Sequence, residues 1–355
     1  MHRNLAVALP RVPTSCFWEI TDACNLRCLH CEADAGRRSA DELTTAEALG
    51  VAARLQQLGC RSVHLTGGEP LVRDDWPVIA RRLHELGLEV TLISNGTLID
   101  AEVIRRMRQA GVSGLSISLD GEREVHDALR VPARSFPGSR YDAAIRALGL
   151  AVGTGLKTAV ITQVHRRNLR ALARMYAGLA ELAITVWQVQ LCMPLGRALR
   201  HARDYLLTPE DLPELEETLA ELVERSQLRI AVADNIGYYG RREPTLRGSV
   251  RATKSFWLGC LAGCRVLALG ASGDVKGCPS HPRKLVVGNL RQTPLEEIWA
   301  DARRFAYNTE WDESRLEGKC RECAHRQLCR AGCTTMAYAV TGSIHRNPYC
   351  VQGHA

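Results

Sequence analysis

Six short runs of β-branched and aliphatic residues recur along the first 195 positions, and longer amphipathic stretches separate them. The runs are nearly continuous in Val, Ile and Leu, a pattern that favours parallel strands buried on both faces. The stretches between them carry helix signals: Thr44 and Glu47 have capping-box spacing, and Asp100 can cap a helix that stops at Gly111. The expected strands cover residues 16–20, 62–67, 89–96, 115–121, 157–164 and 185–192.

Strand–helix units in series imply a parallel sheet. Their regular spacing predicts an α/β fold, a partial TIM-like (β/α)6 barrel. In such barrels the loops that follow the strands carry the chemistry. Cys24, Gly67–Pro70, Asn95 and Asp120 all fall in such loops. We therefore expect a functional site at that end of the barrel.

The remainder of the chain changes character twice. A further amphipathic helix is expected over residues 208–226, and the basic, Gly- and Pro-containing stretch 238–254 is typical of a solvated linker or, alternatively, a dock for an acidic partner. From Cys260 onward, eight cysteines and few regular segments predict a small domain organised by metal rather than by a core. The expected parts are an N-terminal extension (1–13), the barrel (14–235), a basic linker (236–256) and a cysteine-rich domain (257–355).

Composition narrows the class of protein. The 355 residues are 46% hydrophobic and 24% charged, which is globular rather than disordered. No apolar run reaches the length of a membrane span, and the N-terminal one is too short for a signal peptide, so we expect a cytoplasmic protein. In that reducing compartment, 14 cysteines favour metal binding over disulfides. The net charge of +7 is scattered, as on a solvated surface, and we expect no nucleic-acid partner.

Three cysteines follow the first expected strand with the spacing Cys-x3-Cys-x2-Cys. Cys24, Cys28 and Cys31 can converge on one centre, yet three thiolates leave a tetrahedral position open. Ligation by sulfur alone suits zinc or iron–sulfur and disfavours magnesium or calcium. Two alternatives stay open at this point: a zinc site completed by His30 or a distant cysteine, and unrelated buried thiols.

This loop resembles the signature of the radical S-adenosylmethionine (SAM) enzymes, with His30 before the last cysteine. The resemblance implies that the three thiolates hold a 4Fe–4S cluster whose fourth iron binds SAM. It also covers "TGGEP" (Thr66–Pro70), "SNGT" (Ser94–Thr97) and "SISLDG" (Ser116–Gly121), although turn capping is a serious alternative for their polar residues. The SAM contacts that it implies are His30, Thr66, Gly67, Gly68, Glu69, Pro70, Ser94, Asn95, Ser118, Asp120 and, on the fifth strand, Gln163, with Gln190 as a further candidate.

The C-terminal cysteines resemble the SPASM extension of peptide-modifying radical SAM enzymes. By the family's interleaved pattern, a nearer set and a farther set would each hold one auxiliary 4Fe–4S cluster, which makes three clusters in all. Two zinc sites are the alternative. Cys16, Cys60 and Cys192 match no motif and are expected to be packed thiols. The nearer set is Cys260, Cys264, Cys278 and Cys333, and the farther set is Cys320, Cys323, Cys329 and Cys350.

The resemblance implies hydrogen abstraction from a ribosomal precursor peptide, followed by a modification such as a thioether, C–C or C–O cross-link. Sulfatase-maturating relatives carry an Asp where this chain has Pro279, which argues against that reaction. His281 is an acid–base candidate, although a surface histidine is the simpler interpretation. Oxidation or rearrangement of a small molecule, and a non-catalytic metal scaffold, are the alternative functions.

Partners follow from the same resemblance. A flavodoxin or ferredoxin would supply electrons, and both are usually acidic, which agrees with the charge of +7. Few residues precede the first strand, so we expect no fused leader-binding domain and allow for a separate leader-binding protein.

Overall fold

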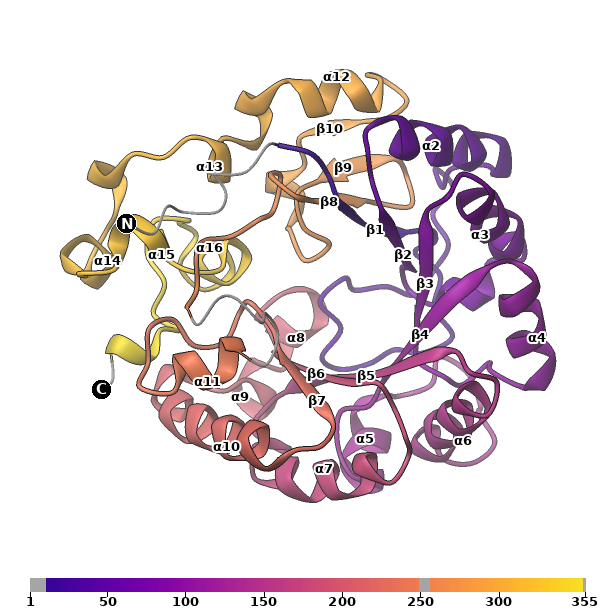
Figure 1. Ribbon diagram of the computed structural model, residues 1–355, viewed down its shortest axis with the longest axis horizontal. Coiled ribbons are helices and arrows are strands. Elements are labelled where there is room, and N and C mark those ends of the chain that lie inside the picture. Colours follow the sequence, from indigo (N-terminus) through magenta and orange to yellow (C-terminus); the bar gives the residue numbers. More distant parts are fainter. Residues whose placement is uncertain (1–10, 249–255, 354–355) are drawn as a thin grey trace.

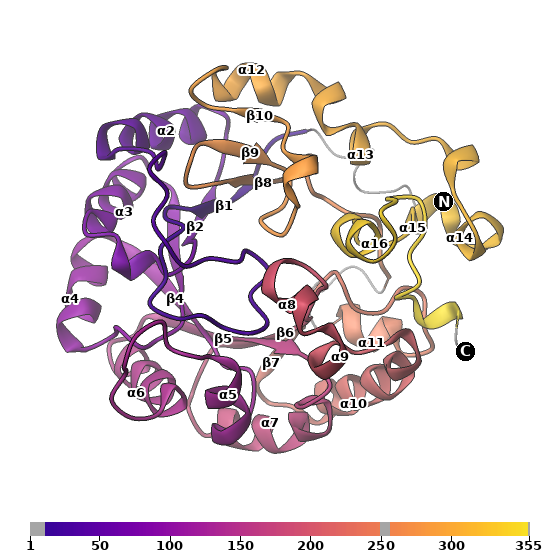
Figure 2. The same ribbon diagram turned by 180° about the vertical axis from the view of Figure 1, so that it is seen from behind.

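The computed structural model describes residues 11–248 and 256–353 and shows the predicted α/β barrel (Figure 1). Its first six strands are parallel and neighbour each other in chain order, as expected. Figures 1 and 2 show the helices around the outside of the curved sheet. The strands are β1 (Ser15–Glu19), β2 (Ser62–Thr66), β3 (Glu89–Ser94), β4 (Val112–Ser118), β5 (Lys157–Val164), β6 (Val186–Leu191), β7 (Arg229–Val232), β8 (Val266–Leu269), β9 (Asp274–Lys276) and β10 (Gly288–Asn289).

The barrel helices begin where their capping residues predict. Thr44 accepts a hydrogen bond from the Glu47 backbone and donates its own NH to the Glu47 carboxylate, and Asp100 accepts from Val103. The expected helix over 208–226 starts with a 3-10 turn, Pro209–Asp211, before its regular part. The helices include α2 (Thr45–Gln57), α3 (Trp76–Glu85), α4 (Ala101–Gln109), α5 (Arg123–Leu129), α6 (Arg140–Val152), α7 (Leu172–Ala180), α8 (Gly196–Arg200), α9 (Ala202–Tyr205) and α10 (Leu212–Arg225).

The barrel strands differ from the expectation of burial on both faces. Exposure alternates along β1, β2, β5 and β6, so only one face of each of these strands is fully buried. The buried face packs under the helices, whereas the inner face carries polar groups, such as Ser15 hydrogen-bonded to His64 at 3.0 Å and His64 to Thr91 at 2.7 Å. A barrel interior that keeps polar, part-exposed side chains leaves room for a site inside it.

The cysteine-rich region is built into the sheet of the barrel, which the sequence does not predict. β8 pairs in parallel with the outer edge of β1, and β9 and β10 follow in antiparallel order, so ten strands form one continuous sheet. Leu267, Val275, Ile298 and Phe305 belong to the same apolar core as the barrel. The expectation of a domain organised by metal alone is therefore wrong for residues 266–305.

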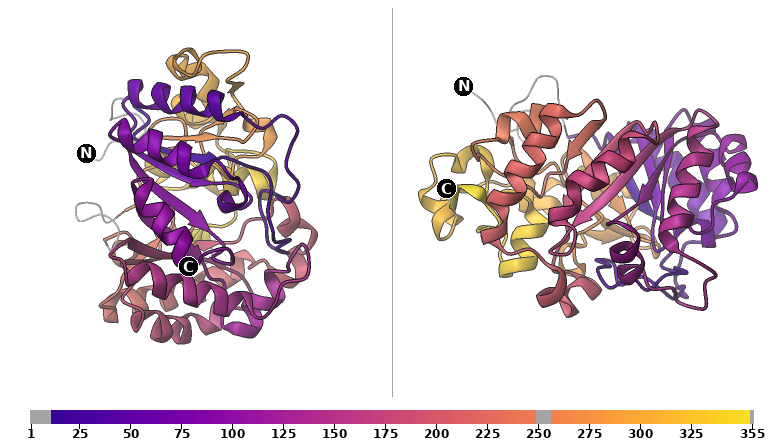
Figure 3. Two further views of the ribbon diagram at one scale, coloured as in Figure 1. Left: turned by 90° about the vertical axis from the view of Figure 1, so that its right-hand side faces the viewer. Right: turned by 90° about the horizontal axis from the view of Figure 1, so that it is seen from below.

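Beyond residue 305 the elements are short. They follow α12 (Leu295–Ala300) and include α13 (Ala306–Thr309), α14 (Lys319–Glu322), α15 (Arg326–Cys329) and α16 (Thr334–Thr341). Figures 1 and 3 show this part as a lobe beside the barrel, near α10 and α11 (Glu243–Gly248). Within the two described ranges, no helix is both long and apolar enough to cross a lipid bilayer.

The basic stretch also differs from a solvated linker in its described part. Tyr238, Tyr239, Glu243 and Arg247 are buried, and Arg247 forms an ion pair with Glu243 at 3.2 Å. This stretch is buried despite its charged residues because Tyr238 and Tyr239 pack with Trp257 and Cys329 in one apolar cluster. Residues 249–254 of this stretch lie outside the described residues.

Candidate active site

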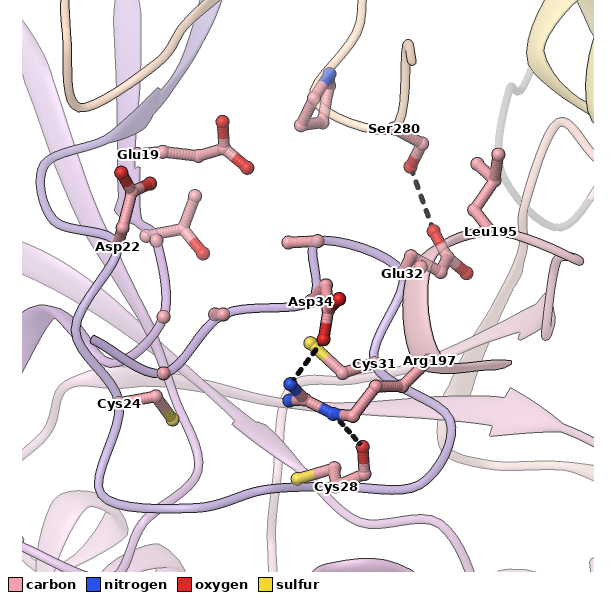
Figure 4. A pocket seen from close by; sticks show the side chains of 18 of the residues that line it. Glu19, Asp22, Cys24, Cys28, Cys31, Glu32, Asp34, Leu195, Arg197 and Ser280 are labelled. Carbon is pink, nitrogen blue, oxygen red and sulfur yellow. Dashed lines mark hydrogen bonds and ion pairs between the residues drawn. The ribbon is translucent and has the colours of Figure 1, made fainter. Parts of the chain in front are cut away.

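A cavity of about 1040 Å³ opens at the carboxyl ends of the barrel strands. Its walls come from the loop after β1, from the ends of β1 to β5, from residues 195–197 and from residues 270–286. The barrel thus supplies one side, and the cysteine-rich region supplies the other. Figure 4 shows Cys24, Cys28 and Cys31 on the loop side and Ser280 opposite them.

The loop that carries the three cysteines is held by backbone hydrogen bonds. Cys24 donates to Gly36 and Gly36 donates to Asp22, which closes the loop on itself. Arg27 and Leu29 donate to residues 131 and 129, which pins its far side to the chain after α5. All three thiols line the cavity and spread around a shared space (Figure 4).

Burial and the neighbouring thiols raise the pKa of Cys24 to about 12, and burial raises that of Cys28 to about 11. These thiols therefore stay protonated at neutral pH unless a cation binds them. A coordinated metal ion deprotonates its thiol ligands, so the donor set fits a cationic iron centre.

A buried charge network stands behind this loop. Arg130 lies 4.0 Å from the Cys28 sulfur and contacts the Asp120 carboxylate at 2.7 Å. His30 contacts the same carboxylate at 2.9 Å, and the backbone NH of Gln163 donates to its other oxygen. Burial alone would raise the pKa of Asp120, but Arg130 and His30 hold it well below its usual range. Asp120 is therefore a charged anchor for Arg130.

Glu69 plays a similar internal part. It is 1% exposed, and its carboxylate accepts hydrogen bonds from the Ser94 hydroxyl at 2.9 Å and the Asn95 backbone at 2.8 Å. Burial raises the pKa of Glu69 to about 7. The preceding glycines serve the same close packing, since a Cβ on Gly67 or Gly68 would lie 2.2 Å from a backbone oxygen of the loop after β1.

The structure divides the predicted SAM contacts into two groups. Glu69, Pro70 and Asp120 do not line the cavity, and Gln190 instead accepts a hydrogen bond from Gln188. For Glu69 and Asp120, the reason is that their carboxylates are used within the protein. The predicted residues that do line the cavity are His30, Thr66, Gly67, Gly68, Ser94, Asn95, Ser118 and Gln163.

Several cavity residues were missed by the sequence analysis. Arg130 lines the cavity, and so does Arg197, which donates to the Cys28 carbonyl at 2.9 Å and pairs with Asp34 at 2.6 Å. Neither arginine belongs to a local motif, so no sequence signal marks them. Glu32 could have been noticed because it directly follows Cys31.

Two contacts join the barrel side of the cavity to the cysteine-rich region. Ser280 donates to the Glu32 carboxylate at 3.1 Å, and Lys276 pairs with Glu19 at 2.9 Å. Burial raises the pKa of Glu32 to about 7. Lys276 also donates to the Pro279 carbonyl at 2.9 Å, which fixes the chain directly after Cys278.

The interpretation of His281 as a surface residue is wrong. It is only 4% exposed, lies at the cavity wall and packs edge-on against Tyr307 with ring centroids 4.9 Å apart. Neither ring nitrogen has a hydrogen-bond partner among the described residues. Burial lowers the pKa of His281 to about 3, so the ring is neutral and a weak base.

The C-terminal thiols that the resemblance assigns to one set influence each other electrostatically, and their ligation of clusters stays a prediction. In the nearer set, Cys260 interacts electrostatically with Cys264, Cys278 and Cys333. In the farther set, Cys329 interacts with Cys320, Cys323 and Cys350. Cys16, Cys60 and Cys192 are buried outside both sets and outside the cavity wall, as packed thiols should be.

An aromatic pair lies between the two sets. The Tyr238 hydroxyl accepts from the backbone of Cys333 at 2.9 Å, and the Trp257 indole donates to the carbonyl of Cys329 at 3.2 Å. Their ring centroids are 5.4 Å apart. The aromatic pair thus contacts the backbone of one cysteine from each set.

Comparison with known proteins agrees with this geometry. The radical SAM superfamily model matches residues 18–177, and the SPASM iron–sulfur cluster-binding domain matches residues 260–324. The chain is 31% identical to an AdoMet-dependent heme synthase of Methanosarcina barkeri, over 97% of this chain and 98% of that protein. It is 30% identical to the mycofactocin maturase MftC of Mycobacterium tuberculosis, over 97% of this chain and 84% of that protein.

Solved structures share the fold. The enzyme anSMEcpe with bound AdoMet superimposes with a TM-score of 0.74 at 18% identity, covering 96% of this chain and 95% of its own. Streptococcus suis SuiB bound to its precursor peptide SuiA gives 0.72 at 17% identity, covering 95% and 75%. This protein belongs to the radical SAM superfamily, as a member with a C-terminal SPASM iron–sulfur domain.

Proposed function

We propose that this protein modifies a ribosomal precursor peptide by radical SAM chemistry and installs a cross-link of the thioether, C–C or C–O type. The observation that carries the proposal is the composite cavity. It reaches the cysteine loop on one side and residues 270–286 on the other, and its rim includes the exposed side chains of Arg37 and Arg283. A cavity of this size can hold a cofactor, and its open rim gives a peptide segment access to it. Relatives named as a mycofactocin maturase and a PqqA peptide cyclase support a peptide substrate.

The cofactors of this proposal are SAM and three 4Fe–4S clusters. Cys24, Cys28 and Cys31 would hold the SAM-binding cluster, and the nearer and farther sets would each hold an auxiliary cluster. Raised thiol pKa values, mutual proximity and all-sulfur donor sets fit this ligation. With a reduced cluster held by Cys24, Cys28 and Cys31, the site would supply the electron for cleavage of SAM into methionine and a radical able to remove a hydrogen atom from substrate.

The chain's own residues position and shield the reactants. Arg130 and Arg197 place positive charge and fixed donors beside Cys28, where an anionic group of the bound ligand would lie. Ser94, Ser118 and Gln163 offer neutral polar groups along the strand ends. His281 would accept a proton only from a strongly acidic intermediate, because its ring is a weak base.

A second candidate is oxidation or rearrangement of a small molecule, because some relatives of this chain are named heme synthases. The observation in its favour is the 31% identity to the heme synthase of Methanosarcina barkeri, which extends over nearly the whole of both proteins. Lys276 and Arg283 on the cavity wall could pair with carboxylate groups of such a substrate.

One anaerobic experiment separates these functions. The reconstituted protein, SAM and a strong reductant are incubated with the short peptide encoded nearest its gene or with a tetrapyrrole precursor of heme, and 5′-deoxyadenosine is quantified. We expect the peptide to raise the yield of 5′-deoxyadenosine and to lose two hydrogen atoms for each cross-link formed, with no product from the triple Cys24→Ala/Cys28→Ala/Cys31→Ala variant. Turnover with the tetrapyrrole alone would replace the peptide proposal by the second candidate. A flavodoxin or ferredoxin and a separate leader-binding protein are further expected partners, to be tested by replacing the chemical reductant and by pull-down with the peptide.

A further inference from the structure

The nearer set is bordered by an arginine from the N-terminal segment. Arg11 stacks over Trp299 and Phe305, with its guanidinium carbon 4.3 Å and 4.6 Å from the two ring centroids. Its Nε donates to the carbonyl of Gly263 at 2.9 Å, and a second nitrogen donates to Trp299. The remaining nitrogen, Nη2, is buried and has no hydrogen-bond partner among the described residues. Arg11 therefore keeps one donor free while it is bonded to Gly263, the residue before Cys264, and its charge interacts with the Cys264 thiol.

A second arginine, Arg330, comes from the C-terminal part of the sequence, and its charge interacts with the same thiol. Arg330 adopts φ 52° at the end of α15, and Ala331 and Gly332 follow with φ 61° and 70°. This left-handed bend between the two cysteine sets is unfavourable for residues other than glycine, so the surrounding packing must hold it. It places the guanidinium 4.8 Å from the Trp311 ring, leaves Nε buried without a partner in the described structure, and brings its charge to Cys264.

A tyrosine completes the border. Tyr307 lies on α13, which Asn308 ties to the Ala262 carbonyl at 2.8 Å. No described residue accepts the Tyr307 hydroxyl proton, and the thiols that act on it are Cys260, Cys278 and Cys264. The hydroxyl reaches this place because residue 277 is glycine: a Cβ there would lie 2.3 Å from the Tyr307 oxygen.

The farther set has different surroundings. Arg321 and Arg326 are close to it in sequence, but Arg321 donates to the Leu316 carbonyl and Arg326 pairs with Glu313. The unpartnered polar nitrogen of the described residues here is the neutral Nδ2 of Asn347, whose backbone contacts Cys320. Two cationic groups thus face the nearer set with free donors, and a neutral amide faces the farther one.

We propose that Arg11, Arg330 and Tyr307 donate hydrogen bonds to sulfur atoms of the cluster held by the nearer set, and thereby raise its reduction potential above that of the cluster in the farther set. The physical basis is the negative charge that a cluster gains on reduction, which nearby cations and N–H or O–H donors stabilise. Buried donors of this kind are costly unless they are satisfied, and cluster sulfur would satisfy all three. The inference rests on the auxiliary clusters proposed above. It means that an electron delivered to the two auxiliary clusters would reside mainly on the cluster of the nearer set.

The experiment uses the full chain with Cys24, Cys28 and Cys31 replaced by alanine, so that only the two auxiliary sites hold iron. After anaerobic reconstitution, a redox titration followed by electron paramagnetic resonance gives one potential for each site. In this background we compare Arg11→Gln, Arg330→Gln and Tyr307→Phe with the control Arg303→Gln, which removes an exposed charge from the same part of the chain.

We expect the higher of the two potentials to fall in all three variants and the lower one to stay in place. For each arginine the expected change is at least tenfold in the oxidised-to-reduced ratio, which is about 59 mV for a one-electron couple. Arg303→Gln should move neither signal. Unchanged potentials, or equal shifts of both signals, would overturn the inference.

Two further readouts keep the test decisive. Tyr307→Phe retains the ring that packs on His281 and Phe305 and removes only the hydroxyl. If an arginine variant loses iron, the potential of Tyr307→Phe therefore still tests the proposed hydrogen bonds. A parent protein that binds well below about eight iron atoms, at four per cluster, would overturn the proposed auxiliary clusters as well. Two intact signals that fail to shift would overturn only the role of the three donors.

Discussion

The cysteine loop of the barrel and the farther cysteine set are both built to hold sulfur ligands, yet the protein supports them in opposite ways. The loop hangs from β1, is closed by backbone hydrogen bonds and rests on the buried Arg130–Asp120 pair. In the farther set, Cys320 and Cys329 lie on α14 and α15, which have four residues each, while Cys323 directly follows α14 and Cys350 directly precedes a 3-10 turn. A helix that short has no stability of its own. The comparison indicates that the first site is shaped by the scaffold, whereas the second depends on what its thiols bind.

Removal of iron should reveal the difference between the two sites most strongly. In protein prepared without iron, we expect amide hydrogen exchange in residues 319–333 to accelerate by at least about 100-fold, because ligand bonds there replace a core. Exchange in α2 and α3 should change little, since those helices pack on the barrel core. Equal protection of residues 319–333 with and without iron would show that the farther set is also preformed.

Loss of the barrel anchor is the next largest effect. Arg130→Met removes the arginine partner of the buried Asp120 carboxylate and leaves it with His30 and the Gln163 backbone NH, so we expect the free energy of unfolding to fall by about 3–5 kcal/mol. Urea unfolding of the iron-free protein measures this. The control Arg123→Gln alters an exposed ion pair on α5 and should cost less than about 0.5 kcal/mol. A loss as small as that of the control would mean that the loop is not anchored through Asp120.

Gly277→Ala tests the support of the nearer set. The new Cβ would lie 2.3 Å from the Tyr307 oxygen and 2.7 Å from the backbone nitrogen of Gly263, so two segments must move apart. We expect a loss of about 1–3 kcal/mol in urea unfolding and a lower iron content. Gly149→Ala, on α6 with open space around it, is the matched control and should be neutral or stabilising. Full stability of Gly277→Ala would show that this approach is not tight.

The smallest effect concerns the surface link between the two parts. Glu47 accepts hydrogen bonds from Arg291 at 2.8 Å and 3.0 Å, and this pairing lowers the pKa of Glu47 to about 2. A lowered carboxyl pKa contributes stability that is present above pH 4.5 and lost as the pH falls toward 2. Because the pair is exposed, we expect only about 0.5 kcal/mol. Thermal unfolding of Glu47→Gln should match the wild type near pH 2 and fall slightly below it at pH 7; a difference that grows toward acid would contradict the assignment.

The sequence predicted the barrel well because each of its signals is local. Alternating strand and helix patterns, the Thr44 and Asp100 caps and the cysteine spacing all act within a few residues, and the structure has each of them. The predictions that failed concern contacts between distant segments. The union of β8 with β1 joins residues some 250 positions apart, and no pattern in residues 266–269 distinguishes an added barrel strand from an isolated one.

The candidate site divides in the same way. Motif spacing predicted the three thiols of the loop, which line the cavity, and the family resemblance implied the two C-terminal sets. Neither could tell which polar residues face the cavity. Asp120 and Glu69 look like ligand contacts in sequence, yet each is used by a neighbour, Arg130 in one case and Ser94 in the other. Whether a polar side chain faces the cavity depends on the hydrogen-bond or charge partner that packs against it, and the fold determines that partner.

The pairing of β8 with β1 also determines how this protein can be divided. β1 uses both of its edges, one for β2 and the other for β8. A chain cut before residue 256 would expose the backbone groups of Ser15–Trp18 as a free sheet edge beside an apolar surface. Such edges recruit strands from other molecules, so the truncated barrel would aggregate rather than remain a minimal enzyme. Any exchange of cysteine-rich regions between relatives must therefore keep β8 with the barrel whose edge it covers.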